Sequence, residues 1–246
     1  MTRLLTALML MAALPSVHAE TFRFYGYAFD LESGDYLYTE VHEQVIEDDV
    51  WQRGRIDYYA PDNSLMGTKE LDFGDGEYVP VYRLELPYKD YAEGISAVGD
   101  QVTLFKEVKG QREEKVIDGA DNLAADSGFH SYLRDNFQAL MEGDTVRMRL
   151  AVAGNLDSYK FRGRKVGDTE FNGQPAVAIK VELDSLLRLL VDDLYLVYEP
   201  EERKLLEYRG ISNVHDPRSG DPYNVRIVYP DAPPDGAPEH LPPPAK

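Results

Sequence analysis

The stretch Val146–Val152 reads VRMRLAV and alternates apolar with basic side chains. Val146, Met148 and Leu150 occupy alternate positions, with an arginine between each pair. Successive side chains of a β-strand point to opposite faces, so one face of this segment is apolar and the other is wetted. Such alternation predicts a strand that lies half-buried in an antiparallel sheet.

The same alternation recurs along most of the chain. Residues 176–183 repeat it, and further extended runs lie between Thr21 and Tyr229. Turn residues such as Asn172 and Gly173 separate neighbouring runs. The pattern predicts a mainly β fold, with about eleven strands in one large curled antiparallel sheet or half-open β-barrel.

Helical spacing interrupts the strands twice. Apolar residues recur every three or four positions over residues 129–141, and Gly143 follows as a stop. A second run, residues 186–191, is almost entirely apolar. We expect two helices that cover the sheet.

The N-terminus predicts a secretory signal peptide, residues 1–19. Arg3 precedes an 11-residue apolar run, Pro15 ends that run, and Val17 and Ala19 form an A-x-A-like cleavage site. Eleven helical residues span about 16 Å, roughly half of a bilayer core, so this segment cannot act as a transmembrane anchor. We expect cleavage after Ala19.

The remainder divides into one domain and a tail. Residues 20–229 predict a single β-rich domain. Residues 230–246 contain seven prolines and show no apolar periodicity, which indicates a disordered proline-rich tail.

Composition restricts the functional classes. The 246 residues carry a formal net charge of -18, which disfavours nucleic-acid binding because the phosphate backbone would be repelled. The absence of cysteine excludes disulfides, thiolate metal sites and a cysteine nucleophile. An exported protein of this size without disulfides is typical of the bacterial periplasm, which is the location we predict.

No motif in the sequence identifies an enzyme. The G-x-S-x-G, H-E-x-x-H and phosphate-loop patterns are absent, and no run of about 18 apolar residues predicts a transmembrane helix. We therefore predict no catalytic residue, metal or cofactor. We also expect a monomer.

Two histidines supply an alternative hypothesis. His215 follows Ser212 and Asn213 and precedes Asp216, and His130 lies near Asp126. These groups could serve a cell-envelope hydrolase that uses His215 or His130 with nearby carboxylates. Turn formation and helix capping explain the same residues without catalysis.

A concave sheet that two helices cover incompletely predicts a binding site. The candidate ligand is an apolar small molecule or lipid, or a segment of an envelope protein. The candidate lining residues are apolar and come from the two predicted helices: Phe129, Tyr132, Leu133, Phe137, Leu186, Leu187 and Leu190. The alternative is that these side chains pack in the hydrophobic core.

Several phrases carry a resemblance to known proteins. YLYTE at 36–40, GRIDYY at 54–59, Gly128–Phe129 and LEYRGISN at 206–213 resemble uncharacterised exported proteins of Gram-negative bacteria. The order of strands and inserted helices is similar to the half-open barrels of the lipoprotein-carrier (LolA/LolB-type) superfamily. That resemblance implies a sheet that curls around helices and holds acyl chains, although no cysteine is present for the lipid anchor of LolB-type members.

The sequence thus leaves three functional classes open. The leading one is a non-catalytic binding or carrier-like protein. The others are the histidine-dependent hydrolase and an envelope scaffold that binds partners through its sheet edge and proline-rich tail.

Overall fold

The computed structural model describes residues 19–48, 50–185 and 193–238. Within them, fifteen strands form one sheet. The first eight strands are β1 (Ala19–Asp30), β2 (Tyr36–Glu47), β3 (Val50–Tyr59), β4 (Leu65–Asp72), β5 (Val81–Leu86), β6 (Tyr91–Ala97), β7 (Gln101–Val108) and β8 (Gln111–Asp118). The others are β9 (Leu123–Ala125), β10 (Val146–Val152), β11 (Asp157–Phe171), β12 (Gln174–Leu183), β13 (Leu194–Tyr198), β14 (Leu205–His215) and β15 (Pro222–Val228).

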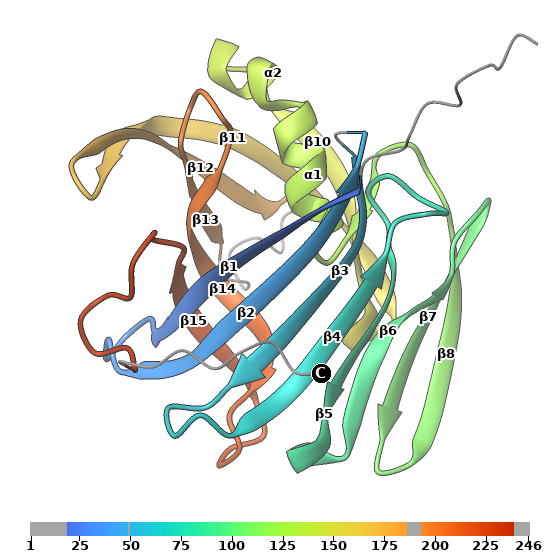
Figure 1. Cartoon of the computed structure of the whole chain (residues 1–246). Coiled ribbons are helices and arrows are strands. Elements are labelled where there is room, and N and C mark those ends of the chain that lie inside the picture. The colour runs from blue at the N-terminus through green and yellow to red at the C-terminus, as the bar shows by residue number, and fades with distance from the viewer. Residues whose placement is uncertain (1–18, 49, 186–192, 239–246) are drawn as a thin grey trace, which may run out of the picture.

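Consecutive strands of the chain pair with each other, except β8 with β9, and β1 also pairs with the last strand, β15. The order runs from β8 back to β1, then through the β1–β15 pair and from β15 back to β9. All pairs are antiparallel except β9 with β10. By pairing, β8 and β9 are the two edges of an open sheet. β8 lies at one side of the curled sheet (Figure 1). The predicted mainly β, curled architecture is confirmed.

The number of strands differs from the predicted eleven. The strands that the sequence alternation did not indicate include β6, β8 and β9. β8 reads QREEKVID, and Ile117 is its one buried residue, so it offers no apolar face to sequence periodicity. β9 spans three residues, which is too short for a period to show.

The predicted first helix is two short helices, α1 (Gly128–Asp135) and α2 (Phe137–Glu142). They divide at Asn136, whose side-chain Nδ2 donates to the carbonyl oxygen of Tyr132 at 2.9 Å and so competes with the helical backbone. Gly143 ends α2 with a φ of 94°, as predicted. The second predicted helix, 186–191, lies outside the described residues.

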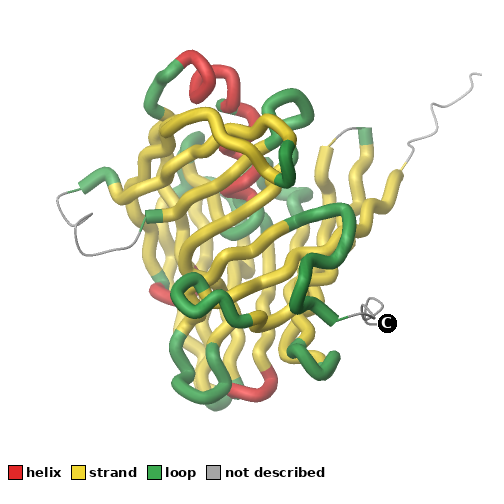
Figure 2. Tube along the Cα trace, turned by 90° about the vertical axis from the view of Figure 1, so that its left-hand side faces the viewer, coloured by secondary structure: helices red, strands yellow, loops and turns green. Residues whose placement is uncertain are grey.

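Two short 3₁₀ turns complete the connections. η1 (Pro87–Lys89) joins β5 to β6, and η2 (Ala153–Asn155) joins β10 to β11. α1 and α2 lie at one end of the curled sheet, and the β5–β6 turn lies at the other (Figures 1 and 2).

Two hydrophobic clusters fill the concave side. The larger one joins β2–β7 to β15 and includes Tyr38, Leu84 and Leu104. The smaller one packs α1 and α2 onto β10–β13 and includes Leu133 and Ile179. The concave side of the described barrel is therefore a packed core.

The signal peptide and the disordered proline-rich tail stay predictions. β1 begins at Ala19, the last residue of the predicted leader, and the preceding residues lie outside the described part. Residues 230–238 form loops and turns, and the rest of the predicted tail lies outside it. Over the ranges described, no helix combines the length and apolarity needed to cross a membrane.

Candidate functional site

A cross-strand row of side chains runs over the outer face of β1–β7. By register, Arg23 stands opposite Glu43, and Glu43 stands opposite Arg55. The alternate positions on these strands, such as Ile56, belong to the core, so the row faces outward.

The row continues across the next four strands. Its further members, each opposite the one before, are Glu70, Arg83, Gly94 and Phe105. The charges alternate in sign over five strands and then give way to a glycine and an aromatic ring. We call this set the outer row.

Ion pairs hold the first half of the outer row. Arg23 and Glu43 lie 2.7 Å apart. Arg55 bonds Glu70 and its own strand's Asp57, each at 2.9 Å. Cross-strand pairs of opposite charge stabilise a sheet by a few tenths of a kcal/mol to about 1 kcal/mol each.

Two guanidinium groups flank the aromatic ring of the second half. The guanidinium carbon of Arg112 lies 4.0 Å from the ring centre of Phe105, and that of Arg83 lies 5.5 Å from it. Both arginines also bond Glu107, at 2.8 Å from Arg83 and 2.7 Å from Arg112. These two hydrogen-bonded cations lower the pKa of Glu107 to about 2.

Gly94 lies beside these groups, where there is no room for a side chain. A Cβ there would lie 1.9 Å from the carbonyl oxygen of Tyr82 and 2.9 Å from Cε1 of Phe105. Only glycine therefore fits the close approach of β5 and β6.

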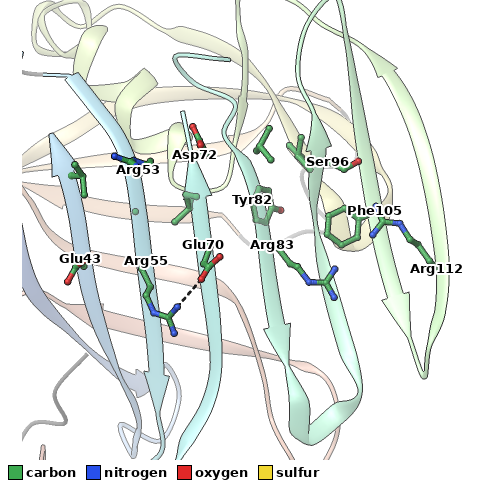
Figure 3. A pocket seen from close by; sticks show the side chains of 15 residues that line it. Glu43, Arg53, Arg55, Glu70, Asp72, Tyr82, Arg83, Ser96, Phe105 and Arg112 are labelled. Atoms are coloured by element: carbon green, nitrogen blue, oxygen red, sulfur yellow. Dashed lines mark hydrogen bonds and ion pairs between the residues drawn. The ribbon is translucent and has the colours of Figure 1, made fainter. Parts of the chain in front are cut away.

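These features surround an open groove of about 770 Å³ (Figure 3). Its charged lining is four arginines and three carboxylates, in a chain whose net charge is -18. The groove lies across β2–β8, with Phe105 and the Ser96 side chain at its β6–β7 end. The charged members are Arg53, Arg55, Arg83, Arg112, Glu43, Glu70 and Asp72.

The barrel interior carries a second polar group of side chains. Lys69 Nζ and Asp126 Oδ2 lie 2.7 Å apart, and Asn213 Nδ2 donates to the same oxygen at 2.7 Å. Nearby, the Tyr91 hydroxyl donates to Glu93 Oε2 at 2.5 Å, and burial raises the pKa of Glu93. Every fully buried polar side-chain atom of the described residues has a hydrogen-bond partner, so this network is satisfied as it stands.

His130 is a partly buried residue of α1. Its Nδ1 lies 3.0 Å from the Tyr198 hydroxyl, and the two rings stack with centres 5.5 Å apart. Burial lowers the pKa of His130 to about 3, so the ring is neutral near pH 7. Ser127 and Asp126 bond each other instead, through Ser127 Oγ and Asp126 Oδ1 at 2.9 Å.

His215 ends β14 at the opposite end of the barrel from the helices. Its ring lies 4.9 Å from the Tyr91 ring, and its Nδ1 contacts the Lys89 Nζ. Neither histidine is placed against a serine hydroxyl by a described contact. The hydrolase alternative, which combines His215 or His130 with nearby carboxylates, stays a prediction.

The structure places four of the predicted ligand-lining residues in the smaller hydrophobic cluster. Phe129, Tyr132, Leu133 and Phe137 are all buried and pack with sheet residues such as Ile179. Their role toward a ligand stays a prediction. The other three, Leu186, Leu187 and Leu190, lie outside the described residues.

The sequence analysis did not predict the outer groove, although part of the charge pattern that marks it can be read in the sequence. Arg53, Arg55 and Asp57 alternate on β3 and mark a charged outer face. Their cross-strand partners depend on register, which sequence periodicity does not give. Among the described side chains, no group of three or more histidines and carboxylates could hold a metal ion.

The chain matches no known family model, and no curated protein matches it significantly. It is similar to a solved structure described as a beta-barrel-like protein of domain of unknown function DUF1849, from Brucella abortus. The identity is 9%, the match covers 88% of this chain and 97% of that chain, and the TM-score is 0.43. The chain thus has an uncharacterised, β-barrel-like neighbour from a Gram-negative bacterium, and the likeness to lipoprotein carriers stays a prediction.

Proposed function

We propose that this chain is an exported, non-catalytic binding protein that holds an extended polypeptide segment of another envelope protein in the outer groove. The observation that carries the proposal is the groove of about 770 Å³ with both signs of charge along it. The predicted signal peptide and the absence of cysteine support export to the periplasm.

A polypeptide fits the groove better than an acyl chain. Seven charged side chains line it, and a hydrocarbon would desolvate them without pairing them. A peptide offers backbone amides and side chains of both signs. The groove's local excess of arginine favours a segment with carboxylates at its Arg83–Arg112 end.

The dimensions define the length of the segment. Seven strands, β2–β8, spaced at about 4.8 Å, span about 29 Å, and an extended chain rises about 3.3 Å per residue. A segment of about nine residues therefore crosses the groove.

An apolar ligand between α1 and the sheet is the alternative. It requires the packed side chains of Phe129, Tyr132, Leu133 and Phe137 to separate, which exposes core surface at a cost of about 25 cal/mol per Å². A preformed groove needs no such opening. We therefore place the polypeptide proposal first.

The test compares two arginines that are matched in exposure and ion pairing but differ in place. Arg83 bonds Glu107 at 2.8 Å with its side chain 41% exposed, and Arg226 bonds Glu207 at 2.7 Å with 42% exposed. Arg226 lies on β15, away from the groove. Calorimetric titration uses a peptide of about nine residues that alternates lysine and glutamate around a central leucine, with oleate as the apolar probe.

We expect the peptide to bind wild type and Arg226→Gln equally. It should bind Arg83→Gln at least about tenfold more weakly, since a charge-assisted hydrogen bond contributes about 1.5–3 kcal/mol. Binding should also weaken with added salt. Equal affinity of the peptide for both variants would contradict the proposal. Saturable binding of oleate, but not of the peptide, would favour the apolar-ligand alternative.

A further inference from the structure

A lysine and a histidine meet at the barrel end opposite the helices. Lys89 closes the η1 turn between β5 and β6, His215 ends β14, and Gly220 lies in the turn before β15. The Nζ of Lys89 contacts His215 Nδ1 and the carbonyl oxygen of Gly220. Because this pair lies outside the groove, any chemistry it performs is independent of the proposed function.

The partners of Lys89 are unusual for this acidic chain. Five described lysines have a carboxylate within 4 Å, and these are Lys69, Lys115, Lys165, Lys180 and Lys204. Lys89 instead contacts an imidazole nitrogen and a carbonyl oxygen. A carboxylate would hold the ammonium form, whereas a neutral imidazole can also accept its proton.

Two tyrosines position His215, one through its backbone and one through its ring. The Tyr88 hydroxyl donates to the His215 carbonyl oxygen at 2.5 Å and accepts from the His215 backbone N–H at 3.2 Å. The Tyr91 ring lies 4.9 Å from the imidazole. An amine within reach of a base, with a third group orienting that base, is the arrangement of an activated nucleophile.

The electrostatics agree with this geometry. Burial and the Lys89 charge lower the pKa of His215 to about 4, so its ring is neutral at neutral pH and its Nδ1 lone pair is unprotonated in the resting protein. Burial also lowers the pKa of Lys89, and Lys106 adds to that effect. Asp221 and Glu93 oppose it by favouring the charged amine.

We propose that Lys89 is an acyl-acceptor site, whose amine takes an acyl group from activated donors such as acyl phosphates and thioesters. The deprotonated amine forms an N–C bond to the acyl carbon. The bond from that carbon to the phosphate oxygen or thioester sulfur breaks, and the leaving group keeps the electron pair. The proton released from nitrogen passes to Nδ1 of His215 and then to water, and nothing is oxidised or reduced.

Site-resolved mass spectrometry of the full mature chain treated with acetyl phosphate tests this assignment. Lys106 is the matched control, because its Nζ also donates to a carbonyl oxygen, that of Gly154 at 3.0 Å, but has no described imidazole contact. Lys204, 47% exposed, reports ordinary surface reactivity. The variant His215→Asn keeps a hydrogen-bond acceptor near Lys89 but cannot take up a proton.

We expect Lys89 to acetylate at least about tenfold faster than Lys106 and Lys204, and His215→Asn to remove that excess while both controls keep their rates. The pH midpoint of the Lys89 rate in wild type should lie below that of Lys204, a readout that does not depend on the variant folding. Acetylation of Lys89 no faster than the controls, or an unchanged rate in a folded His215→Asn protein, would overturn the assignment.

Discussion

Lys69 on β4 and Asp126, the second residue before α1, form an ion pair 2.7 Å long inside the barrel, with side chains 6% and 2% exposed. The contact joins strands of the first half of the sheet to the helical segment inserted between β9 and β10. Asn213 of β14 donates to the same Asp126 oxygen, so three distant segments meet at one carboxylate. The pair thereby fixes how the two halves of the curled sheet close on each other.

Removing one member of this pair should be strongly destabilising. Asp126→Ala leaves a buried ammonium and an unpaired amide, and we expect a loss of about 3–5 kcal/mol in the free energy of unfolding. The double variant Lys69→Met with Asp126→Leu should recover much of that loss, because neither charge of the pair is left without its partner. Urea denaturation measures both. The control is Asp231→Asn in the exposed Lys204–Asp231 pair, which should leave the urea midpoint of unfolding unchanged. A small loss in Asp126→Ala would contradict the prediction and show that water reaches the buried pair.

Acid should destabilise the fold through its neutral histidines. The pKa of His130 falls to about 3 and that of His215 to about 4, from the usual 6.5. The unfolded chain then binds more protons than the folded one, so stability falls as pH drops from about 6.5 towards 4, and for His130 towards 3. Above pH 6.5 neither histidine contributes a pH dependence.

The variant His130→Gln tests the larger share of this effect. At about 1.4 kcal/mol per pKa unit, His130 accounts for at most about 4–5 kcal/mol. Between pH 7 and pH 4.5, the free energy of unfolding should fall less steeply in His130→Gln than in wild type. Carboxylates such as Glu107 take up protons at lower pH, so they do not obscure the comparison. An identical slope in wild type and variant would contradict the assignment.

Gly94 should not tolerate a side chain. Gly94→Ala places a methyl group 1.9 Å from the Tyr82 carbonyl oxygen, so β5 and β6 must separate, at a cost of roughly 1–3 kcal/mol. Gly167→Ala is the matched control, because a Cβ at this strand glycine meets nothing within 4 Å. Thermal unfolding compares the two. Equal melting temperatures would mean that the close approach of the strands is absent in solution.

The helices should contribute core packing. Leu133 is fully buried in the smaller cluster, with Ile179 and Val181 on the sheet side. We expect Leu133→Ala to cost about 2–5 kcal/mol by urea denaturation. Exposed Val166 on β11 offers a control, since Val166→Ala removes surface carbon only. A Leu133→Ala protein of wild-type stability would instead indicate a loosely filled space, as the apolar-ligand alternative requires.

Much of the fold could be predicted because strand alternation is local. The segment Val146–Val152 alternates in sequence and is β10 in the structure. β8 was not predicted because its first five residues are polar and show no alternation. Asn136 splits a helix that apolar spacing alone predicted as continuous. β8 is held by its hairpin pairing with β7, and the break at Asn136 comes from a local side-chain hydrogen bond, and apolar spacing shows neither.

The candidate site was harder to predict because its residues come together only in the folded chain. The outer row joins seven strands through their register, and no single segment contains more than a fraction of it. His215 was recognised from its loop, but Lys89 lies more than a hundred residues away and meets it only in three dimensions. The predicted apolar lining was inferred from helix faces, and a face that packs a core has the same spacing as one that lines a groove.

The most direct test of the groove as a polypeptide site is site-specific photocrosslinking. The chain has no cysteine, so Ser96→Cys in the groove, or Ser33→Cys in the exposed β1–β2 turn, carries a single benzophenone label. If the groove binds a polypeptide, the alternating-charge peptide crosslinks to the label at position 96 and not at position 33. Added salt then abolishes the crosslinked product. Equal crosslinking at both positions, or none at position 96 under conditions where the peptide binds, would contradict this role of the groove.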